Sequence, residues 1–221
     1  SVNVTINNPN GAGSSVYYTL DGSEPTTAST LYNGTPIPVF YSSVLKARAF
    51  ANGFLPSSIT VASFLLGIDH VTPIISLVTD DANLYGPDGI YDHWDQDWQK
   101  DAYIDYFSED NQLIFSQNTG LQIDGGAGGS RSQPQHSMRV ELANGTLGEG
   151  AVNYPLIPNR SERTKYSDFY LRNGSNTYLD YPYKDAFQNE AMCAETNTYY
   201  SAWRPVTVYI NGGYFGLYGL R

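Results

Sequence analysis

The sequence predicts a mostly β protein with an all-β module at residues 1–66, followed by an α+β domain at residues 73–221 that has antiparallel strands and one main helix. Three observations support this fold class. Short runs rich in Val, Ile and Tyr alternate with Gly, Pro and Asn along the whole chain. The 221 residues suffice for two hydrophobic cores. Only YPYKDAFQNEAMCAET has a helical apolar stripe, formed by Ala186, Phe187, Ala191 and Met192.

The first module is expected to contain four strands, SVNVTINN, SVYYTLD, SVLKARAFA and ITVASFLL. In the third strand, Lys46 and Arg48 alternate with smaller apolar residues, which is typical of a half-buried strand. Asp21 opens an Asx turn that ends the second strand, and Pro25 cannot join a β ladder. These features predict a small, purely β unit.

In the second domain, the apolar run PIISLVTD predicts a buried strand after the connector at residues 67–72. The segment KDAYIDYFSEDNQLIFSQNTGLQIDGG predicts three strands with a tight SEDNQ turn, in which Ile104 and Leu113 face inward. Further strands are expected at SMRVEL and DFYLRNGSN. The run RPVTVYINGGYFGLYGLR predicts a hairpin around Asn-Gly-Gly.

A glycine-rich bend between two of these strands, in GLQIDGGAGGSRSQPQHSMRVEL, is the main candidate for chemistry. Its glycines permit positive φ and could turn backbone N–H groups toward a phosphate, with cationic side chains nearby. The alternative is a flexible hairpin connection. The candidate nucleotide-binding residues are Gly125, Gly126, Gly128, Gly129, Ser130, Arg131, His136 and Arg139.

An acidic, aromatic loop precedes this bend. The carboxylates of Asp88, Asp92, Asp95 and Asp97 could hold calcium, although their spacing differs from that of an EF-hand and a solvated loop is the alternative. The aromatic residues could form a sugar platform or a hydrophobic core. They are Tyr85, Trp94, Trp98 and Tyr178. Glu109 and Asp110 are expected to be hydrated in the SEDNQ turn rather than to act as a glycosidase pair.

Composition narrows the classes of partner. A net charge of −10 and a pI near 4.5 would repel nucleic acid and anionic membrane surfaces. The single cysteine, Cys193, excludes an internal disulfide framework and is expected to be a structural thiol. No run of about 18 apolar residues is present, so no transmembrane segment is expected. The surplus of Tyr, Asn, Ser, Thr and Gly favours a bacterial protein that is secreted or displayed at the cell surface.

The segments YYTLDGSEPT, LYNG and LKARAFANGFLPSS resemble the small β-sandwich found at the C-terminus of chitobiases and β-hexosaminidases. The resemblance covers about residues 1–66. It implies an accessory unit beside a functional domain, with the role of a spacer or of a carbohydrate contact.

The segments SRSQPQHSMR, FYLRNGSN and VYINGGYFGLYGLR resemble the spore-coat protein H kinase-like family over about residues 73–221. The resemblance implies a kinase-like fold, and ATP with Mg or Mn as cofactors of a full-length parent. It also implies a lysine where this chain has His136, followed by Ser137, and metal-binding acids beyond residue 221. Because an imidazole is mostly neutral at pH 7, phosphate would be held weakly. We therefore expect this part of the domain to be catalytically incompetent and to hold no cofactor.

Three functions follow from these observations. The first is adhesion or assembly at the bacterial surface, with a cell-surface protein or a glycan as partner. The second is an atypical secretory kinase that transfers phosphoryl groups when full length. The third is a carbohydrate-binding module, which is indicated by the first resemblance and by the 19 tyrosines.

Overall fold

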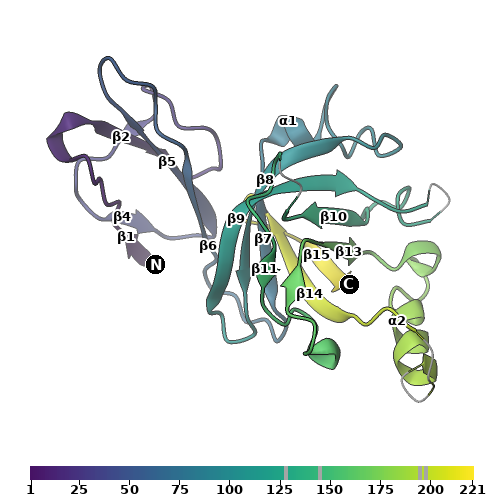
Figure 1. The fold of residues 1–221 in the computed structure, drawn as a ribbon. Helices are drawn as coiled ribbons and strands as arrows, with labels where there is room; N and C mark the ends of the chain where they lie inside the picture. Colours follow the sequence, from purple (N-terminus) through teal and green to yellow (C-terminus); the bar gives the residue numbers. More distant parts are fainter. Residues whose placement is uncertain (127–128, 144–145, 194–195, 197–198) are drawn as a thin grey trace. The chain divides into compact units, whose positions relative to one another are not determined.

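A computed structural model describes residues 1–126, 129–143, 146–193, 196 and 199–221, with the backbone alone for residues 192 and 193. The chain divides into two compact units. The first contains Ser1–Asp69 and the short segment Tyr209–Tyr214, and the second contains His70–Val208 and Phe215–Arg221. Figure 1 labels the strands of both units. No helix among the described residues is long and apolar enough to cross a membrane.

The first unit consists of a four-stranded antiparallel sheet in the order β3-β2-β5-β6 and a separate pair, β1-β4. The bounds are β1 Val2–Val4, β2 Ser15–Thr19, β3 Thr30–Leu31, β4 Ile37–Val39, β5 Ser43–Phe50 and β6 Thr60–Phe64. Val16, Ile37, Leu45 and Ala47 form its buried core. The four strands expected from the sequence correspond to β1, β2, β5 and β6, whereas the short β3 and β4 were not foreseen.

The second unit is built on a closed barrel with the strand order β10-β13-β15-β14-β7-β8-β9 (Figure 1). The bounds are β7 Ile74–Val78, β8 Gln99–Phe107, β9 Leu113–Ile123, β10 Met138–Glu141, β13 Asp168–Arg172, β14 Arg204–Ile210 and β15 Gly213–Leu220. A two-stranded sheet joins β11 Val152–Asn153 to β12 Lys165–Tyr166. Closure of the barrel leaves no free sheet edge, so backbone groups along these strands pair with neighbouring strands.

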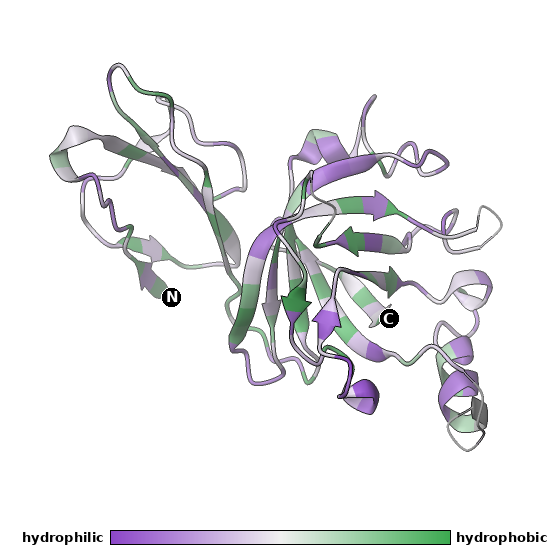
Figure 2. Cartoon of the chain, viewed as in Figure 1, coloured by the Kyte–Doolittle hydropathy of each residue, from purple (hydrophilic) through white to green (hydrophobic). Residues whose placement is uncertain are grey.

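The core of the barrel comes from alternate residues of its strands, and Figure 2 shows bands of hydrophobic residues along them. All five residues of β7 are buried, as the apolar run predicted. Ile104 is fully buried, which confirms its inward orientation. The same prediction is wrong for Leu113, which is 55% exposed. Leu113 begins β9 beside the turn, at a register irregularity opposite Phe107, and therefore lies outside the regular alternation.

The prediction of an α+β kinase-like domain with a main helix is wrong, because the second unit is a β-barrel. The expected helix is limited to α2, Lys184–Gln188, followed by a π-helical turn, Asn189–Cys193. Ala186 is buried, but Phe187 is 71% exposed and Ala191 is exposed, so these two residues of the predicted stripe do not face a core, and the side chain of Met192 lies outside the described residues. A closed barrel covers its own apolar face, so this unit needs no helix packed on a sheet.

The strands between the SEDNQ turn and the glycine-rich bend also differ from the prediction. Residues 113–123 form the single long strand β9 rather than two strands. Other short elements complete the unit. They are α1 Asp81–Leu84 and the 3-10 turns η2 Pro158–Arg160 and η3 Ser175–Thr177, while η1 Gly11–Gly13 belongs to the first unit.

Candidate functional site

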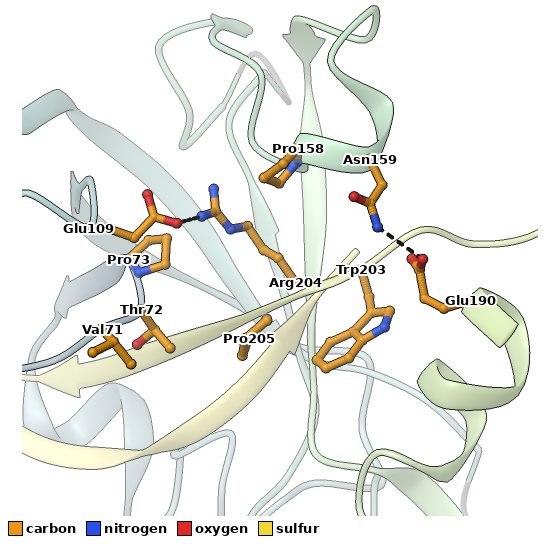
Figure 3. Close-up of a pocket in the computed structure, with 10 residues that line it drawn as sticks. All are labelled: Val71, Thr72, Pro73, Glu109, Pro158, Asn159, Glu190, Trp203, Arg204 and Pro205. Carbon is orange, nitrogen blue, oxygen red and sulfur yellow. Dashed lines mark hydrogen bonds and ion pairs between the residues drawn. The ribbon is translucent and has the colours of Figure 1, made fainter. Parts of the chain in front are cut away.

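A pocket of about 330 Å³ lies in the second unit (Figure 3). Its wall is formed by the residues just before β7, the start of β14, the turn between β8 and β9, η2 and the π-helical turn η4, Asn189–Cys193. The lining residues are Val71, Thr72, Pro73, Glu109, Pro158, Asn159, Glu190, Trp203, Arg204 and Pro205. Segments far apart in the sequence thus meet around one cavity, in the volume range of small-molecule sites.

Arg204 forms the inner wall of this pocket. Its residue exposure is 8%, and its Nη1 donates to the Leu156 carbonyl at 3.0 Å and to Tyr106 Oη at 3.4 Å. Its Nη2 forms an ion pair with Glu109, whose side chain is half exposed. Burial raises the pKa of Tyr106, so the phenol stays protonated near neutral pH. The guanidinium is therefore held in place by the barrel while Glu109 remains accessible from the pocket.

Glu190 contributes the second carboxylate of the pocket. Its Oε2 accepts a hydrogen bond from Asn159 Nδ2 at 2.9 Å, an interaction drawn in Figure 3. Its Oε1 is buried and has no hydrogen-bond partner among the described residues. A buried carboxylate oxygen without a donor is costly, so the wall of the pocket holds an unsatisfied acceptor at Glu190.

Trp203 supplies the aromatic surface of the pocket. Its indole stacks on Tyr183, with ring centroids 5.4 Å apart and an interplanar angle of 18°. On β15, a Cβ placed on Gly219 would lie 3.6 Å from Trp203 Cε3, so the backbone of that strand packs close to the ring. The indole is thus supported by its neighbours before any ligand binds, which lowers the entropic cost of binding.

This combination defines what the pocket can do chemically. A flat apolar ring accommodates the C–H face of a ligand, and the carboxylates of Glu109 and Glu190 accept hydrogen bonds from hydroxyl groups. Asn159 offers an amide that both donates and accepts. Such a set suits a neutral, polyhydroxylated ligand.

The glycine-rich bend is organised differently from this pocket. Asn173 Nδ2 donates to the carbonyl of Ser130 at 3.0 Å and also to that of Gln135. Ser137 N donates to the Ser130 carbonyl at 3.1 Å. Ser130 and Gly129 are buried, and Gly125 has a φ of 115°. Gly126 is exposed, and Gly128 lies outside the described residues. The bend is therefore closed on itself by hydrogen bonds around Asn173.

Each cationic side chain proposed for phosphate already faces a carboxylate. Arg131 pairs with Asp97 at 2.9 Å. Arg139 pairs with Glu141 at 2.8 Å and with Asp168 at 2.5 Å. The sequence alone could not show these pairs, because Asp97 and Asp168 are distant along the chain. Nucleotide binding by the bend stays a prediction.

His136 is buried, with 7% exposure, and packs on Tyr91 with ring centroids 4.5 Å apart. Burial lowers the pKa of His136, which keeps the imidazole neutral at pH 7. Its Nδ1 has no hydrogen-bond partner in the described part of the chain. His136 therefore packs against aromatic side chains and is not an exposed cation.

The acidic loop does not assemble into one cluster. Asp92 Oδ2 accepts from the backbone N of Gly86 at 2.5 Å, and Asp95 Oδ2 accepts from Gln96 Nε2 at 3.1 Å. Among the residues that the structure describes, no group of three or more His, Cys, Asp or Glu side chains could hold a metal ion. Calcium binding by Asp88 and its neighbours stays a prediction without further support.

Of the aromatic residues suggested for a sugar platform, Tyr85 and Trp94 are connected by ring contacts through Tyr91 and His136, and Trp98 packs on a different residue. Trp98 packs on His93 at 4.9 Å, Trp94 lies 6.5 Å from His136, and Tyr85 lies 5.8 Å from Tyr91, all between ring centroids. Trp203, in contrast, lines the pocket and was not singled out from the sequence. Neither were Asn159, Glu190 and Arg204. The sequence feature that indicates Arg204 is its position next to Trp203 at the start of an apolar strand. The side chain of Cys193 lies outside the described residues.

The fold is that of a β protein with two compact units, and a pocket lies in the barrel unit. Residues 1–62 match the chitobiase/beta-hexosaminidase C-terminal domain family. This match confirms the resemblance drawn for the first module, and no finding supports the one drawn to the spore-coat protein H kinase-like family. No curated protein and no solved structure matches the chain.

Proposed function

We propose that the protein binds carbohydrate, and that the pocket around Trp203 and Glu190 holds a sugar ring. The observation that carries the proposal is the pairing, in one cavity, of a supported indole ring with the carboxylates of Glu109 and Glu190. A sugar satisfies both groups at once. Its C–H face packs on the indole, and a hydroxyl donates to the half-exposed carboxylate of Glu109.

The family match of the first unit supports the same proposal. Residues 1–62 match a domain named after chitobiase and β-hexosaminidase, which are carbohydrate-active enzymes. An accessory unit of this kind is consistent with an extracellular protein that attaches to glycans. We therefore place the protein at the cell surface or outside the cell, where glycan binding would serve adhesion or assembly.

The size of the pocket limits the ligand. At about 330 Å³ it lies at the lower end of the range for small-molecule sites, which fits one or two sugar rings better than a long chain lying in a groove. The two carboxylates favour a neutral sugar with free hydroxyl groups, because an acidic sugar would be repelled.

Saturation-transfer NMR with a panel of neutral saccharides, including oligomers of N-acetylglucosamine, glucose and xylose, tests the proposal. A hit is then titrated by calorimetry against two variants. Trp203→Ala should weaken binding at least about tenfold, since the aromatic stacking surface is lost. Trp98→Ala removes a comparable indole that is 37% exposed and lies outside the pocket, and should bind as the unmodified protein does.

Two results would overturn the proposal. One is the absence of binding to every saccharide of the panel. The other is loss of binding in Trp98→Ala with retention in Trp203→Ala, which would move the site to the acidic, aromatic loop.

A further inference from the structure

A second pocket of the barrel unit, of about 270 Å³, is lined by polar side chains and glycine alone. It lies beside α2 and the turn that follows β13. Its residues are Arg172, Gly174, Ser175, Asn176, Thr177, Lys184, Asp185 and Gln188. None of these residues lines the pocket around Trp203.

Positive charge exceeds negative charge at this pocket. Asp185 Oδ2 lies 2.9 Å from Arg221 Nη2 and 3.5 Å from Arg172 Nη2, so two guanidinium groups share one carboxylate oxygen. Lys184 is exposed and forms no ion pair within the described residues. Two guanidinium groups therefore share one carboxylate, and a third cation, Lys184, lines the same pocket, in a protein whose net charge is −10.

The charge of Arg172 is also incompletely satisfied. Its Nε is buried and has no hydrogen-bond partner in the described part of the chain. Burial lowers the pKa of Arg221, and the nearby charge of Arg172 lowers it further, although Asp185 opposes both effects. Arg172 lines the pocket and shares its carboxylate with Arg221, so its guanidinium keeps donor capacity for an oxyanion.

The backbone of residues 174–177, which also lines this pocket, is held by close contacts and hydrogen bonds. Ser175 has a φ of 55°, which is unusual for a residue other than glycine, and its backbone N–H donates to Asn173 Oδ1 at 2.8 Å. Gly174 has a φ of 100°, and a Cβ there would lie 2.4 Å from the Pro182 carbonyl oxygen. Thr177 Oγ1 donates to the Gly174 carbonyl at 3.0 Å. Strained backbone that its surroundings hold in place is typical of binding sites.

We propose that this pocket binds a tetrahedral oxyanion, phosphate or sulfate, through Arg172 and Lys184. The anion would accept from the Arg172 guanidinium and from the Lys184 ammonium, and its charge would balance the positive charge that Asp185 does not neutralise. The same chemistry could be presented by a free inorganic anion or by a sulfated sugar. The inference does not depend on the carbohydrate site, because the two pockets share no residue.

A titration followed by ¹H–¹⁵N NMR tests this site, with inorganic phosphate or sulfate as probe and sodium chloride used to hold the ionic strength constant. Saturable shifts are expected at the amides of Ser175–Thr177 and at Arg172 Nε. Lys184→Gln should weaken binding about fivefold or more, since it removes a charged donor. Lys165→Gln removes an exposed lysine on β12 and should change the affinity less than about twofold.

The variant Asp185→Asn is expected to have the opposite effect on anion binding from Lys184→Gln, so it provides a second test of the site. Removing the carboxylate that competes for both guanidinium groups should tighten anion binding. Shifts that fail to saturate, or equal weakening in Lys184→Gln and Lys165→Gln, would overturn the site. Binding of a sulfated monosaccharide more tightly than inorganic sulfate would identify a saccharide-borne group, and equal affinity would identify the bare anion.

Discussion

Ser137 and Asn173 exchange two hydrogen bonds at adjacent ends of the paired strands β10 and β13. Ser137 Oγ donates to Asn173 Oδ1 at 2.9 Å and accepts from the Asn173 backbone N–H at 3.0 Å. The amide nitrogen of the same Asn173 holds the Ser130 and Gln135 carbonyls. A single buried side chain thus connects the glycine-rich bend to the barrel.

Asn173→Ala should lower the free energy of unfolding by about 2–4 kcal/mol, because it leaves several buried polar groups without partners. Urea unfolding followed by circular dichroism measures this change. Asn176→Ala, at an exposed position three residues on, should change stability by less than about 1 kcal/mol. Equal losses in the two variants would contradict the role given to Asn173.

Two neighbouring glycines of the bend should differ in their tolerance of substitution. Gly125 has a φ of 115°, and an added Cβ would lie 1.8 Å from Ser130 Oγ, whereas a Cβ on Gly126 would meet no atom within 4 Å. Gly125→Ala should therefore cost at least about 2 kcal/mol, and Gly126→Ala less than about 1 kcal/mol. Thermal unfolding of both variants provides the comparison. A bend that tolerates both substitutions would not have the conformation described.

The ion pair of Glu109 with Arg204 should contribute more to stability than an exposed pair. Glu109→Ala leaves the buried guanidinium without its carboxylate and should cost about 1–3 kcal/mol. Glu162→Ala breaks the Arg160–Glu162 pair, whose atoms are 3.8 Å apart, and should cost less than about 0.5 kcal/mol. Urea unfolding at pH 7 measures both. The prediction fails if the two substitutions have the same effect.

Stability should decrease as the pH falls below the ordinary His136 pKa. Burial lowers the folded-state pKa of His136 beneath 6.5, so the unfolded chain takes up the proton more readily than the folded one. The stability contributed by the neutral imidazole is fully present above pH 6.5 and is lost as the pH falls below that value. Melting temperatures between pH 7.5 and 5 should therefore fall less steeply for His136→Phe than for the unmodified protein. Equal slopes would contradict the prediction.

Several elements could be predicted because their signal is local. The alternation in SVLKARAFA is the pattern of a half-buried strand, and β5 has it. The continuous apolar run at residues 74–78 predicted the fully buried β7. The helix prediction failed at α2 because apolar residues at helical spacing do not show whether a surface exists for them to cover. At Phe187 no such surface does, since its side chain is 71% exposed.

In the candidate site too, the local features could be predicted from the sequence and the long-range contacts could not. Glu109 was interpreted as a hydrated turn residue because its neighbours in the sequence are polar, and half of its side chain is indeed exposed. Its partner Arg204 is 95 residues away, however, and no local pattern connects them. The cations of the glycine-rich bend suggested phosphate binding for the same reason. Glu141 is a close neighbour of Arg139 in the sequence, but Asp97 and Asp168, which pair with Arg131 and Arg139, come from distant segments.

The sequence by itself determined the mostly β character, the strands with clear alternation and the family of residues 1–62, since these depend on residue type and short spacing. Only the tertiary structure decided that the strands of the second unit close into a barrel, and that Trp203, Glu190 and Asn159 surround one cavity. Closure depends on pairings between strands far apart in the chain. The free energy of those pairings, and of the charges they bring together, is a property of contacts and not of any one segment.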